Sequence, residues 1–246
     1  MRGDFDGRIA RARQLTTKFP ASASLLDFYV KLVGFQKKIW LGAPDDSRGL
    51  MPHFSELIAL IESSGPDPLK RYAQERLGTP AQQQELLAAS WPFDLPDSPE
   101  PCFYARVLLQ PCAERLAARG DLTARPSSRT CPFCNAKPLL AILRGEGDGA
   151  KRSLLCSLCA TEWTFRRVFC PNCGEDQKDQ LPVYTTDQID YVRVEACDSC
   201  RAYLKSVNLT KEGFAVPEVD EIASVALDVW ADEGGYTKIE TNLLGL

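Results

Sequence analysis

The sequence predicts an α+β protein in which a helical N-terminal domain precedes two small cysteine-rich modules and a C-terminal helix. Three observations predict this organisation. Apolar residues recur at helical spacing before residue 125. Eight of the ten cysteines form C-x-x-C pairs between residues 131 and 200. The composition is that of an ordinary globular protein, with 44% hydrophobic and 25% charged residues, so the chain can bury a core.

These patterns divide the 246 residues into four predicted parts. They are a helical domain at 1–125, a first cysteine module at 126–169, a second at 170–212, and a C-terminal helix with its tail at 213–246. Serine and proline in Arg125–Ser128 (RPSS) predict a linker between the first two parts.

Helices are expected in the N-terminal domain wherever apolar residues follow the i, i+3, i+4, i+7 spacing. Two segments show this pattern, Ser24–Trp40 and Phe54–Ile61. Pro66–Leu77 is a shorter candidate, with Asp67 and Pro68 in its first turn. Thr79 resembles an N-cap, and Pro80 suits the first position of a fourth helix. A last helix is expected from Ser98 to a C-cap at Gly120, with a kink or a restart at Pro111.

Short runs rich in β-branched and aromatic residues predict strands beyond residue 128. The runs are Leu139–Leu143, Ser153–Leu155, Trp163–Phe169, Val183–Thr185, Tyr191–Val194 and Ala202–Leu209. Helical spacing returns at Pro217–Glu233, which is predicted to be one helix. The tail, Gly234–Leu246, is expected to be irregular.

The C-x-x-C pairs carry the chemistry that the sequence shows most clearly. They are Cys131/Cys134, Cys156/Cys159, Cys170/Cys173 and Cys197/Cys200. Two intervening residues allow a tight turn that directs both sulfurs at one point and so provides two corners of a tetrahedron. Asn135 and Gly174 follow the two opening pairs, and both residue types tolerate the positive φ that closes such a turn.

The pairs form an internal repeat that resembles two rubredoxin-like or zinc-ribbon units. Each unit opens with C-P-x-C and closes after a spacer of 21 or 23 residues. The repeat favours sequential pairing and two metal ions. The first ion would bind Cys131, Cys134, Cys156 and Cys159, and the second Cys170, Cys173, Cys197 and Cys200. The alternative is a cross-braced arrangement that joins the first and third pairs.

Four thiolates can hold zinc or rubredoxin-type iron, and the ligands alone do not decide between the two metals. A closed four-cysteine zinc site leaves no position for water, which disfavours hydrolytic catalysis. Nine nearby basic residues can offset the thiolate charge: Lys137, Arg144, Lys151, Arg152, Arg166, Arg167, Arg193, Arg201 and Lys205. They could instead form a nucleic-acid face, which the net charge of -4 disfavours.

The remaining features predict a cytoplasmic protein that is not an enzyme. The N-terminus has no signal-peptide stretch, and no apolar run is long enough to span a membrane. Reduced thiols are expected in the cytosol, which favours metal ligands over disulfides. We expect His53 to be a surface or capping residue and Cys102 and Cys112 to be inert buried thiols. No catalytic constellation is recognisable.

Four segments resemble the FdhE family of formate dehydrogenase accessory proteins. They are Leu155–Trp163 (LCSLCATEW), Cys170–Gly174 (CPNCG), Glu195–Leu204 (EACDSCRAYL) and the closing helix Asp220–Tyr236. The resemblance is specific over residues 131–242. Asn135 departs from the glycine that the family commonly has there, which bears on the geometry of the first turn.

The resemblance implies a helical N-terminal domain followed by two rubredoxin-like modules, and it favours iron, with zinc as the alternative. It also implies cytoplasmic binding of the catalytic subunit of respiratory formate dehydrogenase, a molybdenum enzyme exported by the twin-arginine route, during its maturation. The alternative functions are a zinc-ribbon nucleic-acid binder and a rubredoxin-like electron carrier. Contact surfaces are expected at the cysteine turns and at the tail Glu233–Leu246, whose apolar residues could instead pack on the protein itself.

Overall fold

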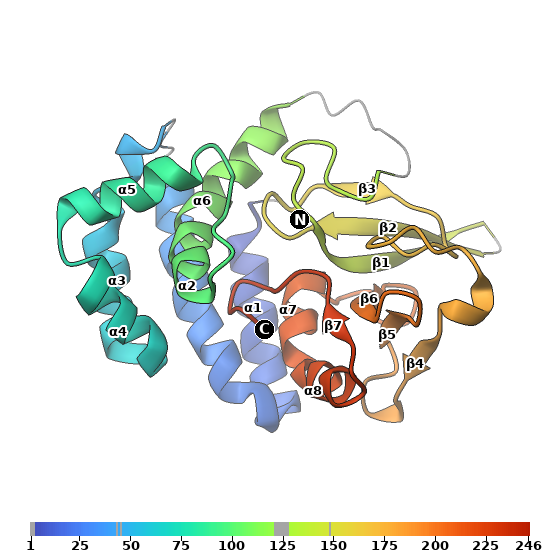
Figure 1. The fold of residues 1–246 in the computed structure, drawn as a ribbon. Coiled ribbons are helices and arrows are strands. Elements are labelled where there is room, and N and C mark those ends of the chain that lie inside the picture. Colours follow the sequence, from blue (N-terminus) through green and yellow to red (C-terminus); the bar gives the residue numbers. More distant parts are fainter. Residues whose placement is uncertain (1–2, 43, 45, 121–127, 148) are drawn as a thin grey trace.

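The computed structural model describes residues 3–42, 44, 46–120, 128–147 and 149–246. Most of the predicted linker, residues 125–127, lies outside these ranges. The α+β class is confirmed, with helices on one side of the molecule and the sheet on the other (Figure 1). None of the described helices combines the length and hydropathy that crossing a bilayer requires.

The helical side contains all the helices that the sequence predicts before residue 125, together with one that it does not. The helices are α1 (Phe5–Lys18), α2 (Ala23–Gly42), α3 (His53–Ser64), α4 (Asp67–Arg76), α5 (Pro80–Ser90) and α6 (Pro99–Arg119). The Thr79 side chain accepts from the backbone N–H of Gln82 and completes a capping box at the start of α5. Short 3-10 turns occur at Pro20–Ser22, Arg48–Leu50, Lys178–Gln180 and Asp187–Ile189.

The helix absent from our sequence predictions is α1. Asp4 caps it by accepting from the backbone N–H of Gly7 at 3.0 Å. Its buried face carries Phe5 and Leu15 but also Arg8 and Arg11. The two arginines interrupt the apolar stripe that would have indicated an amphipathic helix.

Helix α6 runs through Pro111 without the expected restart. Pro111 has no N–H to donate to the carbonyl of Val107, four residues earlier. The Gln36 side chain of α2 donates to that carbonyl at 3.1 Å instead. The C-cap Gly120 has a φ of -77°, so the helix ends without a left-handed glycine.

Within the described ranges, seven strands form one sheet. They are β1 (Pro138–Glu146), β2 (Gly149–Cys156), β3 (Glu162–Thr164), β4 (Val183–Thr185), β5 (Val192–Cys197), β6 (Ala202–Asn208) and β7 (Thr237–Lys238). The order is β3-β2-β1-β6-β5-β4, with β7 beside β6. Strands β1 and β6 pair in parallel, and this pairing joins the first predicted cysteine module to the second. The division into four parts stays a prediction.

The strand predicted at Trp163–Phe169 is wrong beyond Thr164. Phe165 still donates its N–H to the carbonyl of Arg152, after which the chain leaves the sheet. The rings of Phe165 and Phe169 pack edge to face at 5.7 Å. This turn brings Cys170 back toward the sheet.

The single helix predicted at Pro217–Glu233 is two helices, α7 (Pro217–Ala223) and α8 (Val225–Glu233). In an unbroken helix the carbonyl of Glu221 would accept from the N–H of Val225. Here it accepts from Lys205 Nζ at 2.5 Å and from the Ser224 hydroxyl at 2.9 Å. A buried cation from β6 therefore accompanies the break.

The tail is more ordered than expected because it contains β7 and packs on the body of the protein (Figure 1). Tyr236, Ile239 and Leu243 are buried, and Leu244 packs against the helical core. Helix α7 also contributes Val219 to that core. The C-terminal elements thus join the helical side to the sheet.

Candidate metal centres

The first cysteine group lies where the β1–β2 hairpin meets α6. The sulfurs of Cys131, Cys134, Cys156 and Cys159 all lie within 4.8 Å of one another. Cys131 and Cys159 are 3.5 Å apart, Cys134 and Cys156 are 3.4 Å apart, and Cys134 and Cys159 are 3.5 Å apart.

The second cysteine group is formed by the turn after Phe169 and the β5–β6 hairpin. It contains the sulfurs of Cys170, Cys173, Cys197 and Cys200, which also lie within 4.8 Å of one another. Cys170 and Cys200 are 3.8 Å apart, and Cys173 and Cys197 are 3.7 Å apart.

Both groups have the dimensions of a tetrahedral metal site. Metal–sulfur bonds of about 2.3 Å place the four sulfurs of a tetrahedron about 3.8 Å from one another. A disulfide would require about 2.05 Å. The groups combine the first pair with the second and the third with the fourth, so the sulfurs lie in the sequential arrangement and not in the cross-braced one. Two four-cysteine sites that could each hold a metal ion are therefore present.

The same turn positions the sulfurs in all four pairs. The residue after the second cysteine has a positive φ each time: 61° at Asn135, 49° at Ala160, 91° at Gly174 and 56° at Arg201. The sequence indicated the asparagine and the glycine but neither Ala160 nor Arg201, whose side chains give no such signal. Their position after a C-x-x-C pair is the signal that would have found them.

Asparagine in place of glycine at position 135 leaves the opening turn unchanged. Cys131 N–H donates to the carbonyl of Ala136, and Cys170 N–H donates to that of Glu175, both at 2.8 Å. A second hydrogen bond closes each turn at 3.0 Å, from Asn135 in one and Gly174 in the other. The two opening turns therefore share their hydrogen bonds.

Polar groups close to the sulfurs of the first group oppose the effect of burial, which raises the pKa of Cys156. In the first group the backbone N–H groups of Leu158 and Cys159 both donate to Cys156 Sγ at 3.4 Å. The Thr161 hydroxyl lies 3.0 Å from Cys159 Sγ. Thr161 was not among the site residues predicted from the sequence, and it adds a polar side chain beside this sulfur.

In the second group, the thiols of one closing pair differ in acidity. Burial raises the pKa of Cys197 to about 12. Burial also opposes ionisation of Cys200, but the Asn172 side chain and the Ala202 backbone amide donate to its sulfur and lower its pKa to about 7. The two sulfurs of this closing pair therefore have different polar surroundings.

Most of the nearby basic residues neutralise carboxylates. Six of the nine form ion pairs within the described ranges: Arg144, Lys151, Arg152, Arg193, Arg201 and Lys205. Arg152 and Arg193 each lie 2.8 Å from Glu195. Burial raises the pKa of Glu195, but the two guanidinium groups outweigh it and lower that pKa. These cations are not free to act as a dedicated counter-charge for the thiolates.

The other residues singled out in the sequence lie away from the two groups. His53 begins α3 and packs edge-on against Phe35, and burial lowers its pKa. Cys112 is buried as expected. Cys102 is half-buried, and its sulfur lies 3.7 Å from Arg106 Nη2.

The two cysteine groups coincide with two known protein domains. Residues 130–167 match the family described as the FdhE central domain, and residues 168–244 match the FdhE C-terminal domain. Residues 130–244 belong to the FdhE family. The boundary between the two FdhE domains falls between the first and second cysteine groups.

Curated relatives carry the same name. The FdhE homolog of Aquifex aeolicus is 41% identical over 117 residues, which cover 47% of this chain and 41% of that protein. The FdhE homolog of Pseudomonas aeruginosa is 34% identical over 134 residues, which cover 51% of this chain and 42% of that protein. The aligned segments thus span less than half the length of these relatives.

The fold is that of a solved FdhE structure. The crystal structure of the FdhE protein from Pseudomonas aeruginosa superimposes with a TM-score of 0.75 at 23% sequence identity. The match covers 99% of this chain and 96% of that chain. The likeness of fold therefore includes the helical N-terminal part, where the family domains do not match.

Proposed function

We propose that this protein is an accessory protein that binds the catalytic subunit of respiratory formate dehydrogenase in the cytoplasm during maturation. The observation that carries the proposal is that two FdhE domains coincide with the two four-cysteine groups. The FdhE resemblance supplies the partner. The protein acts by binding and not by catalysis, since a closed four-thiolate site offers no position for a substrate or water.

Each cysteine group holds one metal ion in this proposal. The sulfur spacings suit rubredoxin-type iron and zinc alike, and the family resemblance favours iron over zinc. Small modules of this kind bury little apolar surface, so metal binding contributes directly to their folding. The ions would hold the cysteine turns at the fixed positions that a binding surface needs.

The turns of the second cysteine group form the proposed contact surface. Asn172, Cys173, Asp198, Ser199 and Arg201 are exposed there. The tail is less suited to this task because its large apolar side chains pack on the protein itself. The exposed turns can therefore contact a partner without any rearrangement of the core.

Purification with a tag under conditions that induce formate dehydrogenase tests the proposal. We expect the catalytic subunit to copurify with the wild-type protein and with Cys102→Ser, a cysteine outside both groups. We expect Cys173→Ser to lose it. If crosslinked wild-type protein does not recover the catalytic subunit, the proposed partner is wrong.

One observation favours the electron-carrier function as a second candidate. Cys173 is exposed, and electron transfer requires a metal ligand close to the surface. That function needs reversible one-electron reduction of bound iron. Repeated chemical reduction and reoxidation, followed by the iron–thiolate absorption, tests it, and failure to recover the oxidised spectrum would exclude it.

A further inference from the structure

We propose that the two centres have different roles: the first is structural and retains its ion, whereas the second exchanges ligands through Cys173. An external thiolate or a chelating ligand would reach the second ion by displacing that sulfur. The inference rests on the proposed function in that both groups must bind a metal. It adds a division of labour between them.

The first group is built into the interior of the protein. Cys131, Cys156 and Cys159 are each no more than 3% exposed. They belong to an apolar cluster that also contains Ala113 and Ala117 of α6. The ion would therefore link the cysteine turns and the end of β2 to α6.

Apolar packing restricts the approach of a competing ligand to three of the four sulfurs of the first group. Trp163 and Phe165 lie in the same cluster, and the Trp163 indole N–H donates to the carbonyl of Ser128 at 2.8 Å. Only Cys134 is half-buried, and it lines a cavity of about 860 Å³ between the cysteine turn and the tail. Displacing Cys134 would still leave three ligands buried.

The second group lies at the surface. Cys173 is exposed and Cys200 is half-buried, so half of the ligands are accessible. The Asn172 side chain that donates to Cys200 Sγ at 3.5 Å is itself exposed.

These differences predict different mechanisms of metal release. Exchange at a buried centre requires local unfolding, whose free energy can approach that of global unfolding. Exchange at the second centre requires only that an incoming ligand approach Cys173. The remaining ligands of that centre include Cys170 and Cys197, which are buried and retain the ion while one ligand is exchanged.

Release kinetics of the full-length protein test this inference. The protein is loaded with two zinc ions, which elemental analysis confirms, and mixed with an excess of a chromogenic zinc chelator. N-ethylmaleimide is added at intervals, and peptide mass spectrometry identifies the alkylated cysteines. We expect two phases of one zinc each, with rates that differ by about tenfold or more. The thiols alkylated with the fast phase should be Cys170, Cys173, Cys197 and Cys200.

The outcomes separate this inference from the proposed metal sites. A single phase, or alkylation of Cys131, Cys134, Cys156 and Cys159 first, would overturn the division of roles. Loading of fewer than two zinc ions would overturn the metal sites themselves. As a matched pair, Cys173→Ser should accelerate the fast phase and leave the slow phase unchanged, whereas Cys134→Ser should lower the midpoint of thermal unfolding.

Discussion

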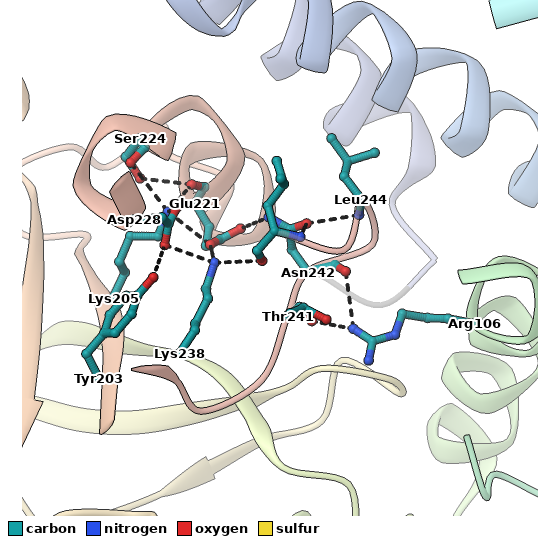
Figure 2. Close-up of polar contacts among 11 residues, drawn as sticks. Arg106, Tyr203, Lys205, Glu221, Ser224, Asp228, Lys238, Thr241, Asn242 and Leu244 are labelled. Carbon is teal, nitrogen blue, oxygen red and sulfur yellow. Dashed lines mark hydrogen bonds and ion pairs between the residues drawn. The ribbon is translucent and has the colours of Figure 1, made fainter. Parts of the chain in front are cut away.

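Glu221 is the buried residue at which the C-terminal elements meet (Figure 2). Its carboxylate lies 2.9 Å from Lys205 Nζ, pairs with Lys238, and accepts from the Asn242 amide at 2.8 Å. Burial raises its pKa, but the two ammonium groups outweigh burial and lower the pKa to about 2. The sequence showed Lys205 only as a cation near the cysteines, because nothing local indicates that it faces α7.

Replacing this carboxylate should destabilise the protein strongly. Glu221→Gln leaves Lys205 and Lys238 with fewer counter-charges in the interior, which costs about 3 kcal/mol when one member of a buried ion pair is lost. Urea denaturation of the zinc-loaded protein at neutral pH measures this loss. Glu233→Gln, at an exposed position near the end of α8, is the control and should change stability by less than about 0.5 kcal/mol.

The stability that Glu221 contributes should depend on pH. The folded-state pKa of Glu221 lies below its ordinary value of 4.5, so its contribution is complete above that value. The contribution is lost as the pH falls from 4.5 toward about 2. The stability difference between wild type and Glu221→Gln should therefore shrink over this interval, although acid also weakens metal binding in both proteins. A difference that stays constant down to pH 3 would contradict the assignment.

Among the elements, α6 and α7 show where local sequence stops determining structure. The capping signal at Thr79 and the spacing in α2 to α5 are local, and the structure confirms them. At Pro111 of α6, Gln36 donates to the carbonyl of Val107, and at the break after α7, Lys205 donates to the carbonyl of Glu221. Both side chains come from distant parts of the chain, so no local pattern could predict them.

The role of Gln36 can be tested by a double substitution. Gln36→Leu leaves the buried carbonyl of Val107 without its donor, which should cost about 1–3 kcal/mol of unfolding free energy. Pro111→Ala restores a backbone N–H that can donate to this carbonyl. In the Pro111→Ala background, the cost of Gln36→Leu in urea denaturation should fall. An equal cost in both backgrounds would show that Gln36 acts through another contact.

At the scale of the whole molecule, buried ion pairs and a shared sheet join the predicted parts. Arg8 of α1 lies 2.8 Å from Glu114 of α6 and 2.7 Å from Glu218 of α7. Arg11 lies 2.6 Å from Asp220. The two cysteine modules are joined by a different contact, the parallel pairing of strand β1 with strand β6.

The cysteine groups were the most predictable feature of the molecule because each C-x-x-C turn is local and its repeat indicates the partner pair. Their joint sheet was not predictable. It depends on the pairing of Leu140 with Lys205, which are 65 residues apart. The different exposure of the two groups depends on the same packing, since only the first lies against α6.

Formate dehydrogenase activity in a strain that lacks this protein tests the central claim most directly. The amount of catalytic subunit is measured in parallel, and plasmids supply wild-type, Cys102→Ser or Cys173→Ser protein. We predict that activity per catalytic subunit falls in the deletion strain and returns with wild type and Cys102→Ser but not with Cys173→Ser. Unchanged activity in the deletion strain would contradict the accessory role.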